Sequence, residues 1–153
     1  TFIFDVGSPL CPSFFHYTTL FRSDTADPAM NSANHVMLLG DLLIWYYEDL
    51  AGIKCAPDAV GFKKLVMEPV FPDGLDEVSA SYGSVYGEIK SAWTKKGGDF
   101  SWDITLPGNT SAIVRIPKKY NVTVGNLPGV RRVSATEGYM EVEIGSGSYH
   151  FGK

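Results

Sequence analysis

Residues 32–51 carry apolar side chains around most of a helical circumference, with only one narrow polar face. Ser32 is a typical N-cap, and Gly52 stands where a residue in the left-handed conformation often ends a helix. We therefore predict one long apolar helix over 32–51. A helix of this kind must be buried on more than one side, whereas a surface helix needs only one apolar stripe.

Beyond Pro57, apolar and polar residues alternate with a period of two, which is typical of strands with one buried face. The alternation is clearest over 87–93 and 100–106, and the segments end at turn residues such as Asp73 and Gly74. Eight strands are predicted: Lys64–Val70, Glu77–Tyr82, Tyr86–Lys95, Phe100–Leu106, Ser111–Ile116, Asn121–Val124, Arg131–Thr136 and Tyr139–Ile144.

Together these elements predict a mainly β fold. We expect an antiparallel, jelly-roll-like β-sandwich, preceded by an irregular segment over residues 1–31 and by the long apolar α-helix. The chain would divide into a helical part over 1–57 and a sandwich domain over 58–153. We expect the helix to belong to a bundle that this chain does not fully supply. Without partner helices, its apolar surface is expected to drive self-association.

The composition of the chain argues against several classes of binding partner. With 13 Lys and Arg against 17 Asp and Glu, the net charge is −4, which argues against nucleic acid and anionic membranes. No apolar run is long enough to span a bilayer. Two cysteines make no disulfide framework, and the three histidines lie too far apart in sequence for a zinc motif. We expect neither a metal nor a cofactor.

Few residues suggest catalysis by themselves. The sequence has no phosphate-binding loop, dinucleotide glycine motif or nucleophile elbow. The adjacent Glu48 and Asp49 point in different directions on the helix, and Glu141 and Glu143 fit the solvated face of a strand. His35, in the first helical turn, is expected to be neutral, and it fits either a ligand contact or a partly buried structural role.

The aromatic side chains leave two interpretations open. On the helix, Trp45, Tyr46 and Tyr47 have the spacing of core residues, although a platform for a sugar ring remains an alternative. On the strands, the aromatic side chains either pack in the core, as favoured for the tryptophans, or form the sugar-stacking face of a binding module. The strand candidates are Tyr82, Tyr86, Trp93 and Trp102.

Short motifs follow one another in a fixed order through most of the chain. The string over 27–35 reads DPAMNSANH and is followed by an aromatic helix that ends in Leu-Ala-Gly-Ile. Over about residues 18–151, the motifs together resemble the C-terminal part of bacterial α-L-rhamnosidases. The later motifs are Gly61-Phe62-Lys63, the turn Leu106-Pro107-Gly108-Asn109-Thr110 and the terminal stretch Gly145–Phe151.

The resemblance implies an (α/α)6 barrel followed by a C-terminal β-sandwich. Residues 32–51 would then be the last helix of a truncated barrel. The parent would be an inverting glycoside hydrolase that releases terminal α-L-rhamnose from glycosides or polysaccharides, so its partner would be a rhamnose-containing carbohydrate. The isolated chain should be inactive, with an ancillary, structural sandwich. A carbohydrate-binding module and an interaction domain are the alternatives, and cytoplasm, periplasm and secretion all stay open.

The resemblance also assigns positions to the site. The family's general base lies in a motif that is matched here by residues 18–22, where Arg22 replaces the glutamate. An arginine stays charged at all working pH values and cannot take a proton from water. Either the match slips here or the base is lost, and the general acid would lie upstream. We therefore predict no catalytic residue in this chain, with His35 as a sugar contact and Asn34 as the residue that orients it.

Overall fold

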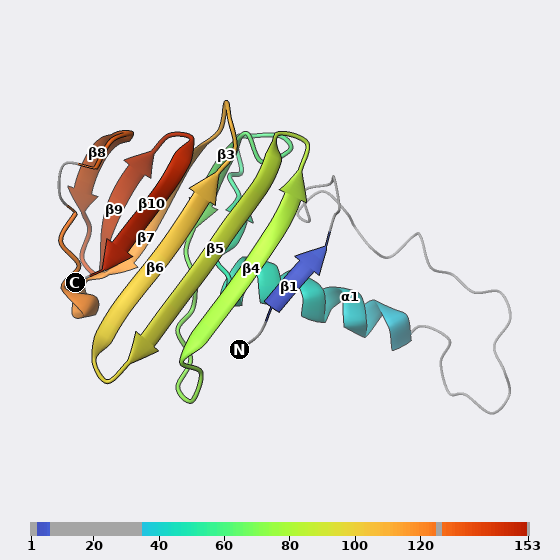
Figure 1. The fold of residues 1–153 in the computed structure, drawn as a ribbon. Helices are drawn as coiled ribbons and strands as arrows, with labels where there is room; N and C mark the ends of the chain where they lie inside the picture. The colour runs from blue at the N-terminus through green and yellow to red at the C-terminus, as the bar shows by residue number, and fades with distance from the viewer. Residues whose placement is uncertain (1–2, 7–34, 125–126, 153) are drawn as a thin grey trace, which may run out of the picture.

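The computed structural model describes residues 3–6, 35–124 and 127–152, with the backbone alone for 3–6 and 35–39. In these ranges, two five-stranded sheets stack face to face and the helix α1 (His35–Trp45) projects from an edge of the stack (Figure 1). This arrangement confirms the prediction of a mainly β sandwich preceded by an apolar helix. The predicted division into parts 1–57 and 58–153 stays a prediction, although residues 53–55 form a strand of the sandwich.

The first sheet has the order β1-β4-β5-β6-β10. The strands β4, β5, β6 and β10 pair antiparallel, while the short β1 adds to β4 in parallel. We call it sheet A. Its strands are β1 (Ile3–Val6), β4 (Glu77–Ser84), β5 (Gly87–Lys96), β6 (Asp99–Leu106) and β10 (Gly147–Gly152).

The second sheet, sheet B, has the order β2-β3-β7-β9-β8. The pairs β2–β3, β7–β9 and β8–β9 are antiparallel, as expected for an antiparallel sandwich, and the pair β3 and β7 is parallel. Three strands of sheet A lie between β3 and β7 in sequence, and the chain returns to sheet B in the same direction. The strands are β2 (Ile53–Cys55), β3 (Lys64–Met67), β7 (Ser111–Pro117), β8 (Val130–Ala135) and β9 (Tyr139–Ile144).

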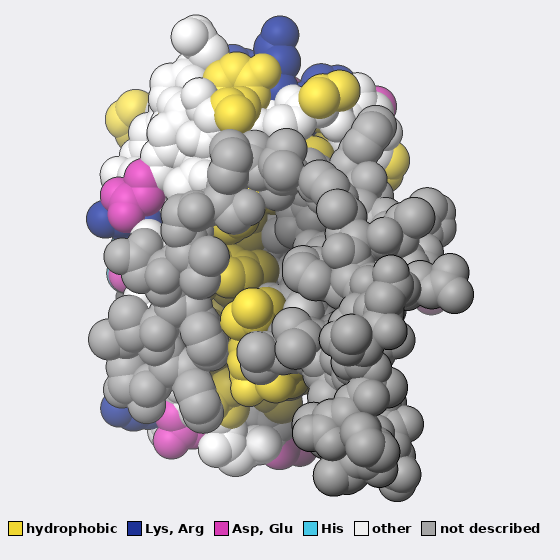
Figure 2. All heavy atoms as spheres, turned by 90° about the vertical axis from the view of Figure 1, so that its right-hand side faces the viewer, with side chains coloured by type: hydrophobic (Ala, Val, Ile, Leu, Met, Phe, Trp, Pro, Cys, Tyr) yellow, Lys and Arg dark blue, Asp and Glu magenta, His cyan; other side chains and the backbone are white. Residues whose placement is uncertain are grey.

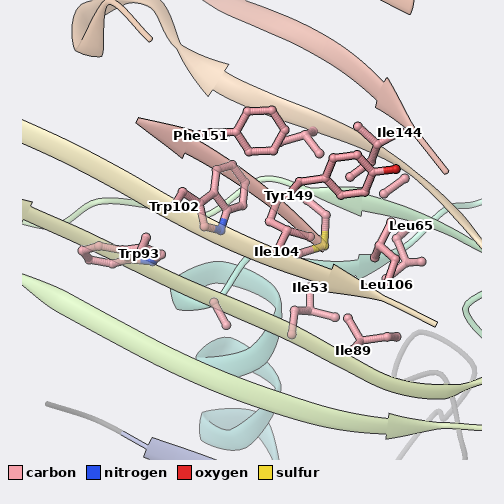
Figure 3. Close-up of a cluster of buried hydrophobic side chains, with 14 of the residues drawn as sticks. Ile53, Leu65, Ile89, Trp93, Trp102, Ile104, Leu106, Ile144, Tyr149 and Phe151 are labelled. Atoms are coloured by element: carbon pink, nitrogen blue, oxygen red, sulfur yellow. The ribbon is translucent and has the colours of Figure 1, made fainter. Parts of the chain in front are cut away.

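The core lies between the inner faces of the two sheets (Figure 3). Inward positions along each strand alternate with outward ones, as the period-two pattern predicts. Trp93 and Trp102 are fully buried and face each other across β5 and β6. Phe71 packs edge-on against Trp93 with ring centroids 4.9 Å apart. Aromatic side chains thus make up a large part of the core.

The helix is observed where the sequence predicts it. α1 spans His35–Trp45 and continues without a break into a single π-helical turn, η2, over Tyr46–Leu50. Residues 32–34, including the expected N-cap, lie outside the described residues. The chain leaves the helix through Gly52, whose φ of +72° confirms the expected left-handed stop.

One predicted strand is wrong and three observed strands were not predicted. Residues 121–124 form a loop after the short 3-10 turn η3 (Lys118–Tyr120). Asn121 takes a positive φ of +49°, which turns the chain, so that Val122 and Val124 enter the core from a loop instead of pairing in a ladder. The unpredicted strands β1, β2 and β10 are short or rich in glycine and serine, and β1 lies within the segment expected to be irregular.

Candidate functional site at the junction of helix and sandwich

The end of the helix is its most unusual part. In η2 the amide of Ala51 donates to the carbonyl of Tyr46 at 2.9 Å, an i to i−5 bond instead of the ordinary i to i−4 bond. The last carbonyls of any helix have no partner within the helix and must find one elsewhere. Because Leu50 and Ala51 are buried, water cannot serve as that partner here.

Side chains of sheet A satisfy these carbonyls. Ser91 Oγ donates to Ala51 O at 2.6 Å, and Trp93 Nε1 donates to Leu50 O at 2.8 Å. Trp102 Nε1 in turn donates to Ser91 Oγ at 3.0 Å, so the serine hydroxyl both donates and accepts. The three side chains are fully buried. The result is a short hydrogen-bonded chain that fixes the helix end to the inner face of β5 and β6.

Backbone groups beyond β3 hold the helix end from the other side. The amide of Glu68 donates to Gly52 O at 3.0 Å, and the amide of Val70 donates to Asp49 O at 2.7 Å. Gly52 lies so close to this segment that an added Cβ would be 2.3 Å from Pro69 N. The helix terminus is therefore bonded to both halves of the sandwich.

Tyr47 adds the apolar part of the junction. Its ring is buried and meets Tyr82 of β4 edge-on, with ring centroids 5.7 Å apart. Its hydroxyl donates to Ser81 O at 3.4 Å. One amphipathic side chain thus packs into the core and still satisfies its polar end. Of the three helix aromatics proposed as core or sugar platform, Tyr47 is core.

The preceding turns of the helix differ. Leu42, Leu43 and Trp45 are large apolar residues with 41%, 38% and 43% of their surface exposed. Figure 2 looks onto the edge from which α1 projects, and hydrophobic side chains gather there in a column. Large apolar groups clustered at a surface usually mark a contact with another protein surface. This side of the helix fits the expectation that something outside the described chain packs against it.

The charged residues at the junction are consistent with a helix end that is partly withdrawn from water. Burial raises the pKa of the Glu48 carboxyl, while nearby Lys54 acts in the opposite direction and Asp49 adds to the increase. The ammonium of Lys54 pairs with Asp49 at 3.2 Å. Glu48 therefore resists ionisation where the helix meets the sandwich.

The predicted site residues fall where the structure describes no side chain. Arg22 and Asn34 lie outside the described residues. His35 is the first residue of α1, and only its backbone is described. The prediction of a sugar contact by His35 and Asn34, and the replacement of a general base by Arg22, stay predictions.

Most of the other sequence candidates have structural roles. Tyr82, Trp93 and Trp102 are buried and cannot present a ring to a sugar, so the predicted core packing of the tryptophans is confirmed. Glu141 receives a hydrogen bond from Arg115 at 2.9 Å on the outer face of sheet B. Tyr86, the remaining aromatic candidate, is exposed at the turn between β4 and β5.

Ser91 is the functional residue that the sequence reasoning missed. It stands between Ile89 and Trp93 in the inward-facing row of β5. A hydroxyl in an otherwise apolar row is a visible signal, because a buried polar group needs a hydrogen-bond partner. The pattern does not reveal that the partner is a helix carbonyl forty residues earlier in the chain.

In the part of the chain that the structure describes, no helix has the length and apolar character needed to cross a membrane. No group of three or more His, Cys, Asp or Glu side chains is arranged to hold a metal ion within those same ranges.

Comparisons with known proteins give consistent matches. The family described as the bacterial alpha-L-rhamnosidase C-terminal domain matches residues 52–131. An alpha-L-rhamnosidase of Streptomyces avermitilis is 33% identical over 124 residues, which cover 81% of this chain and 12% of that protein. One from Formosa agariphila is 33% identical over 92 residues, which cover 60% of this chain and 10% of that protein.

Solved structures agree in fold. The S. avermitilis alpha-L-rhamnosidase complexed with L-rhamnose superposes with a TM-score of 0.66 at 29% identity, over 84% of this chain and 12% of that one. The alpha-L-rhamnosidase from Dictyoglumus thermophilum superposes with a TM-score of 0.64 at 27% identity, over 75% of this chain and 13% of that one. The chain therefore spans only about an eighth of the relatives that it matches.

Proposed function

Because the chain belongs to the family of bacterial α-L-rhamnosidase C-terminal domains, we propose that it is the C-terminal part of an α-L-rhamnosidase. The parent would release terminal α-L-rhamnose from glycosides or polysaccharides with inversion at the anomeric carbon. The general acid would lie in the part of the parent upstream of this chain, and Arg22 stands at the position that matches the family's general base.

In this proposal the sandwich is a structural clamp on the last helix of the barrel. The observation that supports it best is the pair of buried hydrogen bonds from Ser91 and Trp93 to the final carbonyls of the helix. These bonds fix the C-terminal end of the helix, and the exposed apolar residues Leu42, Leu43 and Trp45 would pack against neighbouring barrel helices. The helix would thus be shared by two domains.

The residues proposed for substrate contact are His35 and Asn34, at the other end of the same helix. A clamp at one end would hold the opposite end steady, because a helix is a stiff rod over sixteen residues from His35 to Leu50. The sandwich would thereby act on catalysis indirectly, by positioning a substrate-binding residue. This role requires no sugar site in the sandwich core.

A chimeric enzyme tests the proposal. The matched C-terminal segment of the S. avermitilis enzyme is replaced by residues 35–153 of this chain, and hydrolysis of an aryl α-L-rhamnoside is measured. We expect the chimera to be active and the isolated 153-residue chain to be inactive. Turnover by the isolated chain, or a soluble folded chimera without activity, would contradict the proposal.

The alternative function is a sugar-binding face on the strands. Three of its four aromatic candidates are buried and cannot contact a sugar. Tyr86 remains as the exposed aromatic candidate. An interaction domain without enzymatic context would need a partner for the helix other than a barrel. The chimera separates these alternatives, because neither of them restores rhamnoside hydrolysis.

A further inference from the structure

A groove of about 650 Å³ opens at one end of the sandwich. The strand registers place the turns between β4 and β5, between β6 and β7, and between β9 and β10 at this same end. Figure 1 shows these turns together at the top of the molecule. The lining residues are Lys63, Lys64, Tyr86, Asn109, Thr110, Ser111, Arg131 and Ser146. We call this site the end groove.

The charge of the end groove is opposite to that of the chain. Among the described residues, three cations, Lys63, Lys64 and Arg131, line it and no carboxylate does, although the chain as a whole carries a net charge of −4. Dark-blue side chains are visible at this end in Figure 2. A local excess of cations on an acidic protein produces a field that attracts anions.

The three cations are neutralised to different degrees. Lys64 is bonded to Asp58, and this bond lowers the pKa of the Asp58 carboxyl and raises that of Lys64. Arg131 has Glu143 only at 4.0 Å. No described residue forms an ion pair with Lys63. Lys63 and Arg131 are therefore the cations with the most charge left for a ligand.

The side chains of Arg131 and Tyr86 each lie beside a glycine, which has no side chain to crowd them. A Cβ added to Gly145 would be 3.5 Å from Arg131 Nη2, and one added to Gly61 would be 3.8 Å from Tyr86 Cε2. The Tyr86 ring, 38% exposed, is thus supported along one edge by the backbone. Its turn is held by Ser84 Oγ, which accepts from the Tyr86 amide at 3.2 Å.

The remaining lining groups are suited to hydroxyl ligands. Asn109 is exposed at φ +60° in a turn that Thr110 Oγ1 closes by donating to Pro107 O at 2.7 Å. Its amide can both donate and accept, as can the hydroxyl of the exposed Ser146. A cationic pair, an exposed ring and neutral hydrogen-bonding groups around one groove match the chemistry of an acidic sugar.

We propose that the end groove binds an acidic saccharide unit, such as a uronate within a polysaccharide. Its carboxylate would be held by Lys63 and Arg131, its ring would lie against Tyr86, and its hydroxyls would bond to Asn109 and Ser146. The anionic part of the proposal rests on the groove itself, and the saccharide part rests on the proposed function as a rhamnosidase domain. By binding such units, the groove would hold the parent enzyme bound to a charged polysaccharide.

Calorimetric titration of the 153-residue chain with an oligogalacturonate tests this, with a neutral maltodextrin and inorganic phosphate as comparison ligands. We expect binding of the oligogalacturonate that weakens with salt, and none of the maltodextrin. The double variant K63Q/R131Q should weaken binding by at least about tenfold. K96Q removes one charge at the opposite end of β5 and should leave binding unchanged.

Y86A distinguishes a saccharide from a simple anion. It should weaken oligogalacturonate binding by about tenfold and leave any phosphate binding unchanged. Absence of oligogalacturonate binding, equal loss in K96Q, or indifference to Y86A would overturn the proposal. All four substituted side chains are at the surface, so unchanged melting temperatures check that the variants are folded.

The rhamnosidase chimera keeps the two proposals apart. K63Q/R131Q and Y86A should leave hydrolysis of a small aryl rhamnoside unchanged, because that substrate has neither a carboxylate nor a uronate ring for the end groove to bind. An inactive chimera that still binds oligogalacturonate would contradict the proposed function alone. An active chimera that does not bind oligogalacturonate would contradict only the proposal that the end groove binds an acidic saccharide.

Discussion

The two halves of the helix have the same apolar character and opposite surroundings. At the C-terminal end, Tyr47 and Leu50 are 7% and 4% exposed, and the final carbonyls receive hydrogen bonds from both halves of the sandwich. One turn earlier, Leu42, Leu43 and Trp45 are about 40% exposed. The helix is therefore not simply a buried element of this fold.

The difference supports the proposal that the helix is shared by two domains of the parent. Hydrogen bonds and close packing at the helix end are specific to the sandwich, since Gly52 fits against Pro69 and no larger residue would. The exposed apolar side has no such specific partner among the described residues. A helix that needs burial on several sides but obtains it only at one end requires a second surface.

The largest expected effect comes from closing the tightest contact of the junction. G52A would place a Cβ 2.3 Å from Pro69 N at a φ of +72°. We expect a loss of about 3–4 kcal/mol in the free energy of unfolding, from overpacking together with backbone strain. Chemical denaturation measures it.

Gly74 supplies the matched control for that variant. Its φ is +80°, but nothing lies within 4 Å of an added Cβ. G74A should cost only the strain, about 1 kcal/mol. Equal losses in G52A and G74A would mean that the close approach of helix and sandwich is unimportant.

Ser91 gives the second largest effect. S91A leaves both Trp102 Nε1 and Ala51 O without their partner in a buried site. We expect a loss of about 2–3 kcal/mol in the free energy of unfolding, because unsatisfied buried polar groups are costly. The control S101A changes a serine on the outward row of β6 and should stay within about 0.5 kcal/mol. An unchanged free energy of unfolding in S91A would show that the hydrogen-bonded chain does not stabilise the fold.

Substitutions in the exposed half of the helix should change self-association and leave the free energy of unfolding nearly unchanged. L42Q/L43Q replaces two exposed leucines and should change the free energy of unfolding by no more than about 0.5 kcal/mol. It should instead reduce self-association, which sedimentation equilibrium measures. A wild-type chain that stays monomeric at all concentrations would contradict the expectation that this surface seeks a partner.

The smallest effect concerns Glu48. Because burial raises the pKa of its carboxyl, the folded state binds the proton more tightly than the unfolded state. The contribution of Glu48 to stability is thus fully present below the ordinary glutamate pKa and is lost as pH rises through the raised value. E48Q should be more stable than wild type at pH 7 by about 0.5 kcal/mol, a small figure because solvent screens a half-buried group.

The pH dependence checks that sign. The difference in melting temperature between E48Q and wild type should shrink as pH falls below the ordinary glutamate pKa. If the difference in melting temperature stayed constant across this pH range, the effect of E48Q would come from packing and not from the ionisation of Glu48.

Local periodicity was enough to predict much of the fold. The alternation of apolar residues located seven of the ten strands that the described residues form, and the apolar stretch before Gly52 located the helix. It failed at Asn121–Val124, because two valines pack equally well from a loop or from a strand, and at the short strand Ile53–Cys55, which has too few residues to show a period.

The junction was harder to predict than the elements. Burial of Trp93 and Trp102 follows from their inward positions, but their indole hydrogen bonds depend on which backbone approaches them. Likewise, the parallel pairing of β3 with β7 is set by the path of the chain through both sheets. Contacts between residues far apart in sequence leave little trace in a local pattern.

Hydrogen exchange along the helix tests the shared-helix account most directly. In the isolated chain at low concentration, amides of Tyr47–Gly52 should be protected as strongly as those at the centre of β5, and protection should fall steeply over His35–Trp45. Uniform protection along the whole helix, or rapid exchange at Ala51 and Gly52, would contradict the account.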